Sequence, residues 1–221
     1  MRQRHTINAW GTKLYFDCEG EAFDSVAAFA EITSFVSLVD DLFSTYKPDS
    51  VVSQIRSGRL DLDSAPADVI EVANLCAVAR ELTNGAFDPW SVPGGFDPSG
   101  YVKGWAADRV SEILVKAGVE HVQVNAAGDL TLRGGFLTQE GVIEPWKIGV
   151  VNPDNRQEVL RVFEIHDGAI ATSGTYERGA HIVDPHSGLI AIGAKSATVI
   201  GPDGGLADAL ATALMVSGDD G

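Results

Sequence analysis

Two residues near the C-terminal end of the chain, Asp208 and Thr212, could bind a metal ion. They stand four positions apart in an apolar stretch that follows two glycines, and on a helix this spacing puts both side chains on one face, one turn apart. A carboxylate and a hydroxyl so placed could give two oxygens to a hard cation such as Mg²⁺. The plainer interpretation is that Asp208 caps the helix and Thr212 packs against it, and the spacing alone does not decide between the two.

A glycine-rich segment before a predicted helix could bind an anion. It runs from Asp97 through Gly100 and Lys103 to Gly104. Backbone N–H groups and the helix dipole at such a helix start favour a phosphate, and the lysine adds a positive charge. The spacing is neither that of a Walker A loop nor that of a dinucleotide fingerprint. An ordinary turn into a helix is therefore the alternative.

The loop at 83–89 places an aromatic ring, Phe87, between Gly85 and Asp88. An exposed ring on such a loop could stack on a flat ligand. The plainer interpretation, which we favour from this loop alone, is a turn whose phenylalanine packs into the core.

The segment at 172–188 brings hydroxyls, two imidazoles and a carboxylate into one short span. His181, at the start of an apolar run, is either a general base or a structural histidine, whereas His186 lies in a turn and is expected to be solvated. Ser173 is not on a strand-turn-helix elbow, so the segment does not indicate a serine hydrolase triad.

Hydrophobic periodicity predicts the elements that position these residues. Helices are predicted over 22–43, 66–81, 103–117 and 206–216. Strands are predicted over 13–18, 121–124, 129–133, 146–151, 159–165, 169–172, 181–183 and 196–200. Because helices and strands are largely segregated along the chain, we expect an α+β fold with helices packed on a largely antiparallel or mixed sheet.

The charge balance excludes several classes of partner. The chain has 16 Lys and Arg against 31 Asp and Glu, a net charge of −15. Nucleic acid is bound chiefly by neutralising its phosphates, so we expect no nucleic-acid binding. The longest apolar stretch, 206–216, contains an aspartate and is far shorter than the roughly 20 residues of a spanning helix, so no membrane insertion is expected.

The two cysteines, Cys18 and Cys76, have no metal-site spacing and are expected to be free thiols in a reducing compartment. The basic N-terminus is not followed by the apolar core of a signal peptide. We therefore expect a cytoplasmic protein, with an exported form possible if a leader was removed.

Taken together, these segments resemble the ApbE family, the FAD:protein FMN transferases. No block is specific alone, but the blocks follow the family's order along nearly the whole chain, at 44–50, 83–89, 103–108, 172–178, 181–188 and 207–213. The resemblance implies one domain over 1–221 with an α+β architecture similar to the T-fold.

The resemblance also implies a Mg²⁺-dependent activity. Such enzymes bind FAD, split its pyrophosphate, attach FMN to a Thr or Ser hydroxyl of a flavin-acceptor protein and release AMP. Carried over by position, the metal ligands are the carbonyl of Gly100, Asp208 and Thr212, and the residue that activates the acceptor hydroxyl is His181. The flavin contacts are Trp10, Tyr46, Ala86, Phe87, Asp88, Asp97, Lys103 and Val183.

Two other functions use the same residues. An FAD pyrophosphatase would give FMN and AMP, and it differs only in that water attacks instead of a protein hydroxyl. A binding module would hold FAD without transfer, an alternative that Trp10 leaves open because it stands where the family commonly has Met.

Overall fold

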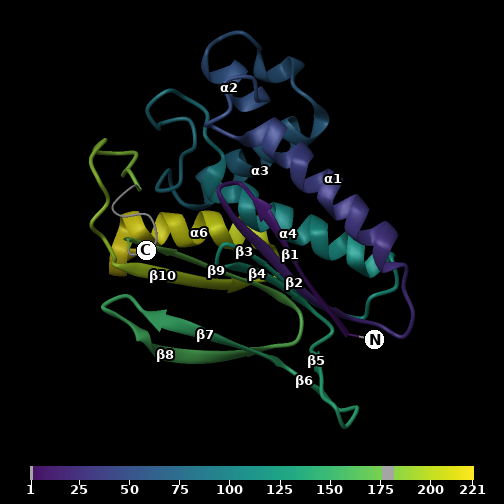
Figure 1. The fold of residues 1–221 in the computed structure, drawn as a ribbon. Coiled ribbons are helices and arrows are strands. Elements are labelled where there is room, and N and C mark those ends of the chain that lie inside the picture. The colour runs from purple at the N-terminus through teal and green to yellow at the C-terminus, as the bar shows by residue number, and fades with distance from the viewer. Residues whose placement is uncertain (1, 176–181) are drawn as a thin grey trace.

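The structure, a computed structural model, describes residues 2–175 and 182–221 and is built on an antiparallel sheet of six strands. In spatial order these are β1 (Arg2–Ala9), β2 (Thr12–Glu19), β3 (His121–Ala126), β4 (Asp129–Arg133), β9 (Gly168–Gly174) and β10 (Ser196–Gly201) (Figure 1). The predicted α+β fold on a largely antiparallel sheet is confirmed.

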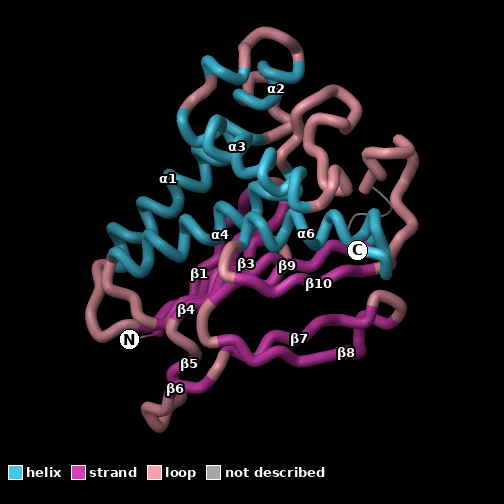
Figure 2. The backbone as a smooth tube through the Cα atoms, turned by 180° about the vertical axis from the view of Figure 1, so that it is seen from behind, coloured by secondary structure: helices cyan, strands magenta, loops and turns pink. Residues whose placement is uncertain are grey.

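Helices cover one face of this sheet (Figure 2). Helices α4 (Ser99–Lys116) and α6 (Gly204–Ser217) lie on it, and α1 (Ser25–Phe43) packs against α4 and against strands β1 and β2. The other helices among the described residues are α2 (Val51–Arg56), α3 (Ala67–Leu82) and two 3-10 turns at Leu62–Ser64 and Gly218–Asp220. In the described part of the chain, no helix has the length and hydropathy needed to cross a membrane.

A separate two-stranded ribbon, β7 (Trp146–Asn152) paired with β8 (Asn155–Ile165), lies on the side of the sheet away from the helices (Figures 1 and 2). A short hairpin of β5 (Phe136–Leu137) and β6 (Ile143–Glu144) precedes it. Both are inserted between β4 and β9, which pair directly with each other in the main sheet.

The strands differ in which face carries their apolar side chains. In β2, Leu14, Phe16 and Cys18 pack with the helices. In β4 the pattern is reversed: Leu130 and Leu132 pack with the ribbon side chains. Because side chains alternate along a strand, the polar residues of β4 must then face the helices.

Several elements differ from the sequence prediction. Strand β1, helix α2 and the β5–β6 hairpin were not predicted, and α4 begins at Ser99, before the predicted start at 103. The predicted strand at 181–183 is wrong for Val183, which makes only an isolated bridge to Ile190; His181 lies outside the described residues. The turn between β1 and β2 requires positive φ at Trp10 (52°) and Gly11 (73°), which closes this hairpin tightly.

Candidate functional site

The ammonium group of Lys103 lies between two buried carboxylates. Its Nζ is 2.8 Å from Oδ2 of Asp129 and 2.6 Å from Oδ2 of Asp208. The two aspartate side chains are 5% and 3% exposed, and that of the lysine is 23% exposed. Buried carboxylates are retained only when they are paired or bind a cation. In this structure the cation that both carboxylates pair with is the ammonium of Lys103.

Each member of this cluster comes from a different element. Lys103 is in the first turns of α4, Asp129 opens β4, and Asp208 is in the second turn of α6. Asp129 faces the helices because its neighbours on the strand, Leu130 and Leu132, pack toward the ribbon. Because the apolar side chains of β4 face the ribbon, its carboxylate lies beneath α4 and α6.

Further oxygen atoms lie beside the cluster. Thr212 follows Asp208 by one helical turn, and its Oγ1 is 3.2 Å from Oγ of Ser173 on β9. Gly100 lies against the same hydroxyl: a Cβ built on it would stand 3.3 Å from Thr212 Oγ1 and 3.2 Å from the Phe87 ring. The expected residues Gly100, Asp208 and Thr212 are thus brought together.

The close approach of α4 and α6 depends on glycines. A Cβ on Gly104 would lie 2.0 Å from the carbonyl oxygen of Gly204, and one on Gly205 would lie 2.3 Å from the Tyr101 ring. Such distances are far inside van der Waals contact. The backbones of the two helices therefore touch, and only glycine permits that contact.

Burial and charge shift the pKa values in the cluster. Burial, reinforced by the charge of Asp129, raises the pKa of Asp208 to about 7, although Lys103 opposes the shift. Burial would lower the pKa of the lysine, but the two carboxylates outweigh it and raise that pKa above its ordinary value. The lysine therefore stays charged.

The donor set fits a Mg²⁺ ion. Two carboxylates, a threonine hydroxyl and nearby backbone are hard oxygen donors, which Mg²⁺ prefers. Among the described residues there is no group of three or more His, Cys, Asp or Glu that could hold a metal. A site here would rest on Asp129 and Asp208 with neutral oxygens, and so it would suit an ion that shares its shell with water and phosphate rather than zinc.

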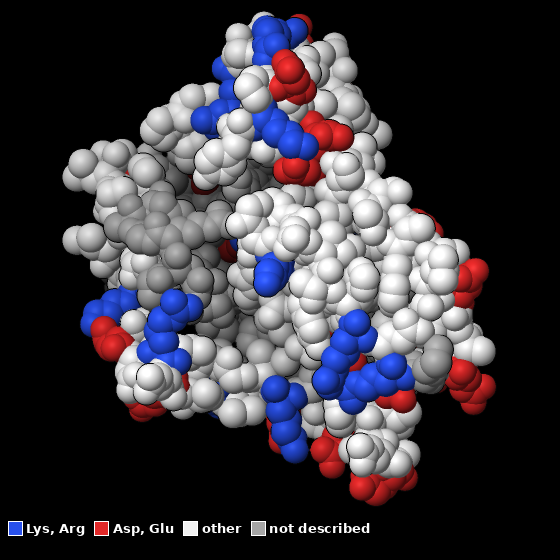
Figure 3. All heavy atoms as spheres, in the orientation of Figure 1, with Lys and Arg blue, Asp and Glu red and all other residues white. Residues whose placement is uncertain are grey.

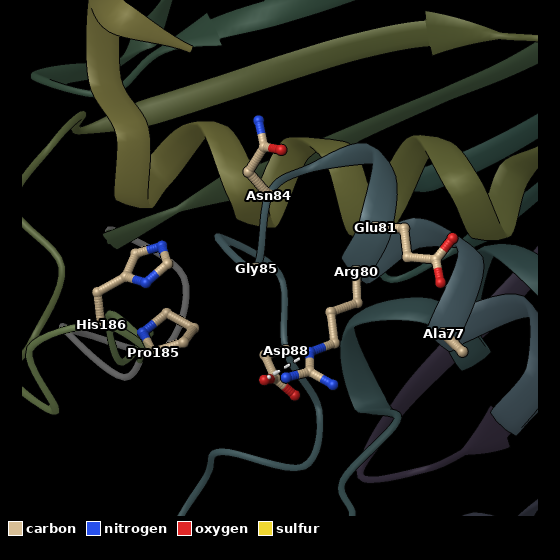
Figure 4. Close-up of a pocket in the computed structure, with 8 residues that line it drawn as sticks. All are labelled: Ala77, Arg80, Glu81, Asn84, Gly85, Asp88, Pro185 and His186. Atoms are coloured by element: carbon tan, nitrogen blue, oxygen red, sulfur yellow. Dashed lines mark ion pairs between the residues drawn. The ribbon is translucent and has the colours of Figure 1, made fainter.

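A cavity of about 600 Å³ lies between the end of α3, the loop at 84–88 and the Pro185–His186 turn. As Figure 4 shows, Arg80 and Asp88 point toward each other on one side, 2.9 Å apart, and Pro185 and His186 approach from the other. Phe87, next to the cavity residue Asp88 in the chain, lies against Gly100, so this loop also contacts the start of α4. The volume of the cavity is in the range of small-molecule sites, and its lining is mostly charged or polar.

A sequence profile of the ApbE family matches residues 93–221, more than half of the chain. The chain belongs to the ApbE family. Among its relatives, the FAD:protein FMN transferase of Vibrio cholerae is 37% identical over 134 residues, and that of Escherichia coli is 32% identical over 128 residues. The chain spans only 39% and 35% of the lengths of these two relatives, and the matches take in 56% and 53% of the chain itself.

Solved ApbE structures have the same fold. The flavin transferase ApbE from Vibrio cholerae superimposes with a TM-score of 0.85 at 26% identity, covering 100% of this chain and 88% of that one. The ApbE protein of Thermotoga maritima gives the same TM-score, identity and coverage. The architecture described above is therefore that of ApbE proteins.

The remaining residues expected from the ApbE resemblance lie in varied settings. Phe87 is 4% exposed and Ala86 is also buried, as in the plainer interpretation of that loop, so the ring has little free face for stacking. The carboxylate of Asp97 accepts hydrogen bonds from the backbone N–H and hydroxyl of Ser99 at the start of α4. Tyr46 is 91% exposed.

Two further expected residues flank other hollows. Trp10 lines a shallow hollow at the β1–β2 turn, and its indole N–H donates to the carbonyl of Val36. Val183 stands shortly before the Pro185 and His186 wall of the cavity. His181, the expected base, lies outside the described residues.

Sequence reasoning assigned no role to three residues that lie in this candidate site or line the cavity. Asp129 has a carboxylate on Lys103, and Arg80 and His186 line the cavity. The signal for Asp129 was present: in the run Asp-Leu-Thr-Leu the apolar residues alternate with polar ones. Local pattern does not reveal which face of a sheet is covered by helices, so it could not say where that aspartate would point.

Proposed function

We propose that this chain is a Mg²⁺-dependent FAD:protein FMN transferase, which moves FMN from FAD to a Thr or Ser hydroxyl of a flavin-acceptor protein and releases AMP. The observation that carries the proposal is the buried pair Asp129 and Asp208 around one cation, with Thr212 one helical turn from Asp208 on α6. The relatives in Vibrio cholerae and Escherichia coli, which are FAD:protein FMN transferases, suggest the reaction class.

In this proposal Asp208, Thr212 and the carbonyl of Gly100 hold Mg²⁺, and Asp129 adds a second carboxylate beside Asp208. When bound, the ion would neutralise negative charge on the phosphate oxygens of FAD. Lys103 would turn its ammonium toward the pyrophosphate, where the first turn of α4 also presents backbone N–H groups. Positive charge at this point matters because the chain as a whole is strongly acidic. On the face drawn in Figure 3, basic and acidic side chains are interleaved.

The flavin nucleotide would extend from this cluster into the cavity. Arg80 and Asp88 offer a polar edge and His186 an imidazole. Because Phe87 is buried, its contribution would be a rigid wall between cavity and cluster, with contacts to FAD from the backbone of 86–88. Trp10, Tyr46, Asp97 and Val183 stay proposed contacts.

The bond changes follow from in-line displacement at the FMN phosphorus. The acceptor oxygen forms a new bond to phosphorus while the bond to the bridging oxygen of the pyrophosphate breaks, so AMP leaves with that oxygen. The hydroxyl proton passes to a base, for which we propose His181. The contribution of the protein is chiefly to position the groups and to stabilise charge.

The test is to incubate the protein with FAD, Mg²⁺ and a flavin-acceptor domain, then to measure flavin fluorescence of the acceptor on a denaturing gel and AMP by chromatography. Fluorescent acceptor together with AMP supports the proposal. AMP without labelled acceptor would identify a pyrophosphatase instead, and neither product would leave a binding module.

A matched pair of variants tests the site. Asp208→Ala removes a proposed ligand, whereas Asp63→Ala removes the same charge from an exposed 3-10 turn. We expect AMP release to be lost only in the first variant. Equal activity of the two would refute the role of Asp208. A His181→Ala rate close to wild type would show that His181 is not the base.

A further inference from the structure

A third aspartate, Asp108, lies on the same helix as Lys103 but does not touch the cluster. Its Oδ1 accepts a hydrogen bond of 2.6 Å from the hydroxyl of Thr131, and its Oδ2 accepts one of 2.7 Å from the backbone N–H of Gly204. The side chain is 17% exposed, and the guanidinium of Arg133 stands 3.7 Å from Oδ1. Both carboxylate oxygens are therefore committed to fixed partners.

These two bonds join the same three elements that carry the cation cluster. Asp108 is on α4 with Lys103, Thr131 is on β4 with Asp129, and Gly204 begins α6, which carries Asp208. Thr131 follows Asp129 by two residues and so projects from the same face of the strand. Gly204 precedes Asp208 by four residues, about one turn of the helix. The carboxylate of Asp108 thus joins α4, β4 and α6, the same three elements that the ion pairs of Lys103 join.

The backbone contact between α4 and α6 limits how these two helices can move relative to each other. The backbones of α4 and α6 already touch at Gly104 and Gly204, so the helices cannot move closer. They can still slide or rotate against each other about that contact point. The bond from Asp108 to the N–H of Gly204 opposes sliding, and the bond to Thr131 fixes both helices relative to β4. Hydrogen bonds to an ionised acceptor are short and strong.

From this arrangement we infer that Asp108, acting with Thr131, is a positioning residue for the cation site: it sets the separation of the Asp129 and Asp208 carboxylates. The inference rests on the proposed metal site at these carboxylates. Asp108 supplies no ligand and touches no substrate. It orients two of the elements that supply ligands, a role in which loss of one hydrogen-bond partner commonly weakens metal binding.

The experiment is a titration of the full chain with Mn²⁺ alone, followed by electron paramagnetic resonance of the free ion. Asp108→Ala removes both bonds, and Thr131→Val removes one while keeping the side-chain shape. Asp108→Asn can still accept from Gly204 while its amide donates to Thr131. Leu114→Ala serves as the stability control, because Leu114 is fully buried on α4 in a different part of the core.

We expect Asp108→Ala to weaken Mn²⁺ binding roughly 10- to 100-fold, Thr131→Val to weaken it less, and Asp108→Asn to restore most of the affinity. Leu114→Ala should lower the melting temperature and leave Mn²⁺ affinity near the wild-type value. If Asp108→Ala does not fold, Thr131→Val carries the test.

The two possible failures are distinguishable. If the wild-type protein binds no Mn²⁺, the metal site itself is overturned and the inference with it. The same holds if the Asp208→Asn variant binds Mn²⁺ as tightly as the wild-type protein does. Wild-type binding that depends on Asp208, together with unchanged affinity in Thr131→Val and in whichever Asp108 variants fold, would overturn the inference alone. A loss of affinity in Leu114→Ala equal to that in Asp108→Ala would do the same, because it would reflect stability only.

Discussion

The two faces of the β4 and β9 strands support very different structures. On the helix side, α4 and α6 touch through glycine backbones, and the site side chains are paired across elements. On the ribbon side, the first eight of the 11 residues of β8 are exposed, among them Val159, Leu160 and Val162. On the helix side, close packing holds the charged side chains in place. On the ribbon side, apolar side chains are exposed to solvent. Tolerance to substitution should differ accordingly.

The largest expected effect comes from a methyl group at the helix contact. Gly104→Ala places Cβ 2.0 Å from the carbonyl of Gly204, so the helices must separate, and we expect a loss of more than about 4 kcal/mol or no folded protein. Urea denaturation measures it. The matched change on the ribbon, Gly149→Ala, meets only Val159 methyls at 3.2 Å and should cost less than about 1 kcal/mol. Similar losses in both would contradict the comparison.

The next effect concerns activity rather than folding. Asp208→Asn keeps the shape of the buried side chain but removes its charge from the Lys103 cluster. We expect AMP release from FAD to fall at least about 100-fold, as when a group that stabilises transition-state charge is lost, while the melting temperature changes little or rises. Chromatography of AMP across a Mg²⁺ series measures it. Wild-type rates at every Mg²⁺ concentration would contradict it.

A smaller, pH-dependent effect tests how well the helix-facing side excludes water. Burial, reinforced by the charge of Asp17, raises the pKa of the Cys18 thiol from 9.0 to about 11. The folded state thus keeps a proton that the unfolded state loses above pH 9. Stability from this group is present below pH 9 and declines as the pH rises toward 11. Denaturation midpoints should fall more steeply over that range for wild type than for Cys18→Ala.

The same thiol gives a direct chemical check. Native protein should resist alkylation at pH 8, because the thiolate is the reactive form and Cys18 is fully buried. Unfolded protein should react freely. Rapid alkylation of Cys18 in the native state would show that water enters the helix-facing layer.

The smallest effect is expected on the ribbon. Leu160→Ser replaces a side chain that is 57% exposed, so stability should stay within about 0.5 kcal/mol of wild type. AMP release from FAD should be unchanged. Thermal denaturation and the AMP assay measure the two. A large loss of AMP release in this variant would mean that the two faces are not independent.

The sequence predicted those elements whose signal is local. Helical periodicity located α1, α3 and α6 because each buries a continuous apolar stripe. Strand β1 escaped prediction because its Arg-Gln-Arg-His-Thr run is mostly exposed at the sheet edge, and it exists as a strand through its pairing with β2. Helix α2 has only six residues and no periodic signal.

The site was predictable to the same extent. The spacing of Asp208 and Thr212 within one helix could be read directly, and the segment with Gly100 and Lys103 was singled out as a possible anion site. The ion pairs of Lys103 with Asp129 and Asp208 could not be predicted from the sequence. They join residues that are distant in the chain and that meet only because two helices pack on one strand. Reversal of the apolar face in β4 is likewise a property of what covers the sheet, which no single strand encodes.

The place where the inserted β5–β8 segment leaves and rejoins the main sheet determines where insertions and deletions can be tolerated. The N–H of Gly134 donates to Asp167, and that of Gly135 donates to the carbonyl of His166, so the inserted segment leaves and returns at one point. Strands β4 and β9 pair beside that point regardless of what lies between. Residues can therefore be gained or lost by insertion and deletion near the Pro153 turn while Asp129 and Ser173 keep their places. Close to the point where the segment rejoins the sheet, insertions and deletions should not be tolerated, because Trp146 packs against Leu130 and Leu132.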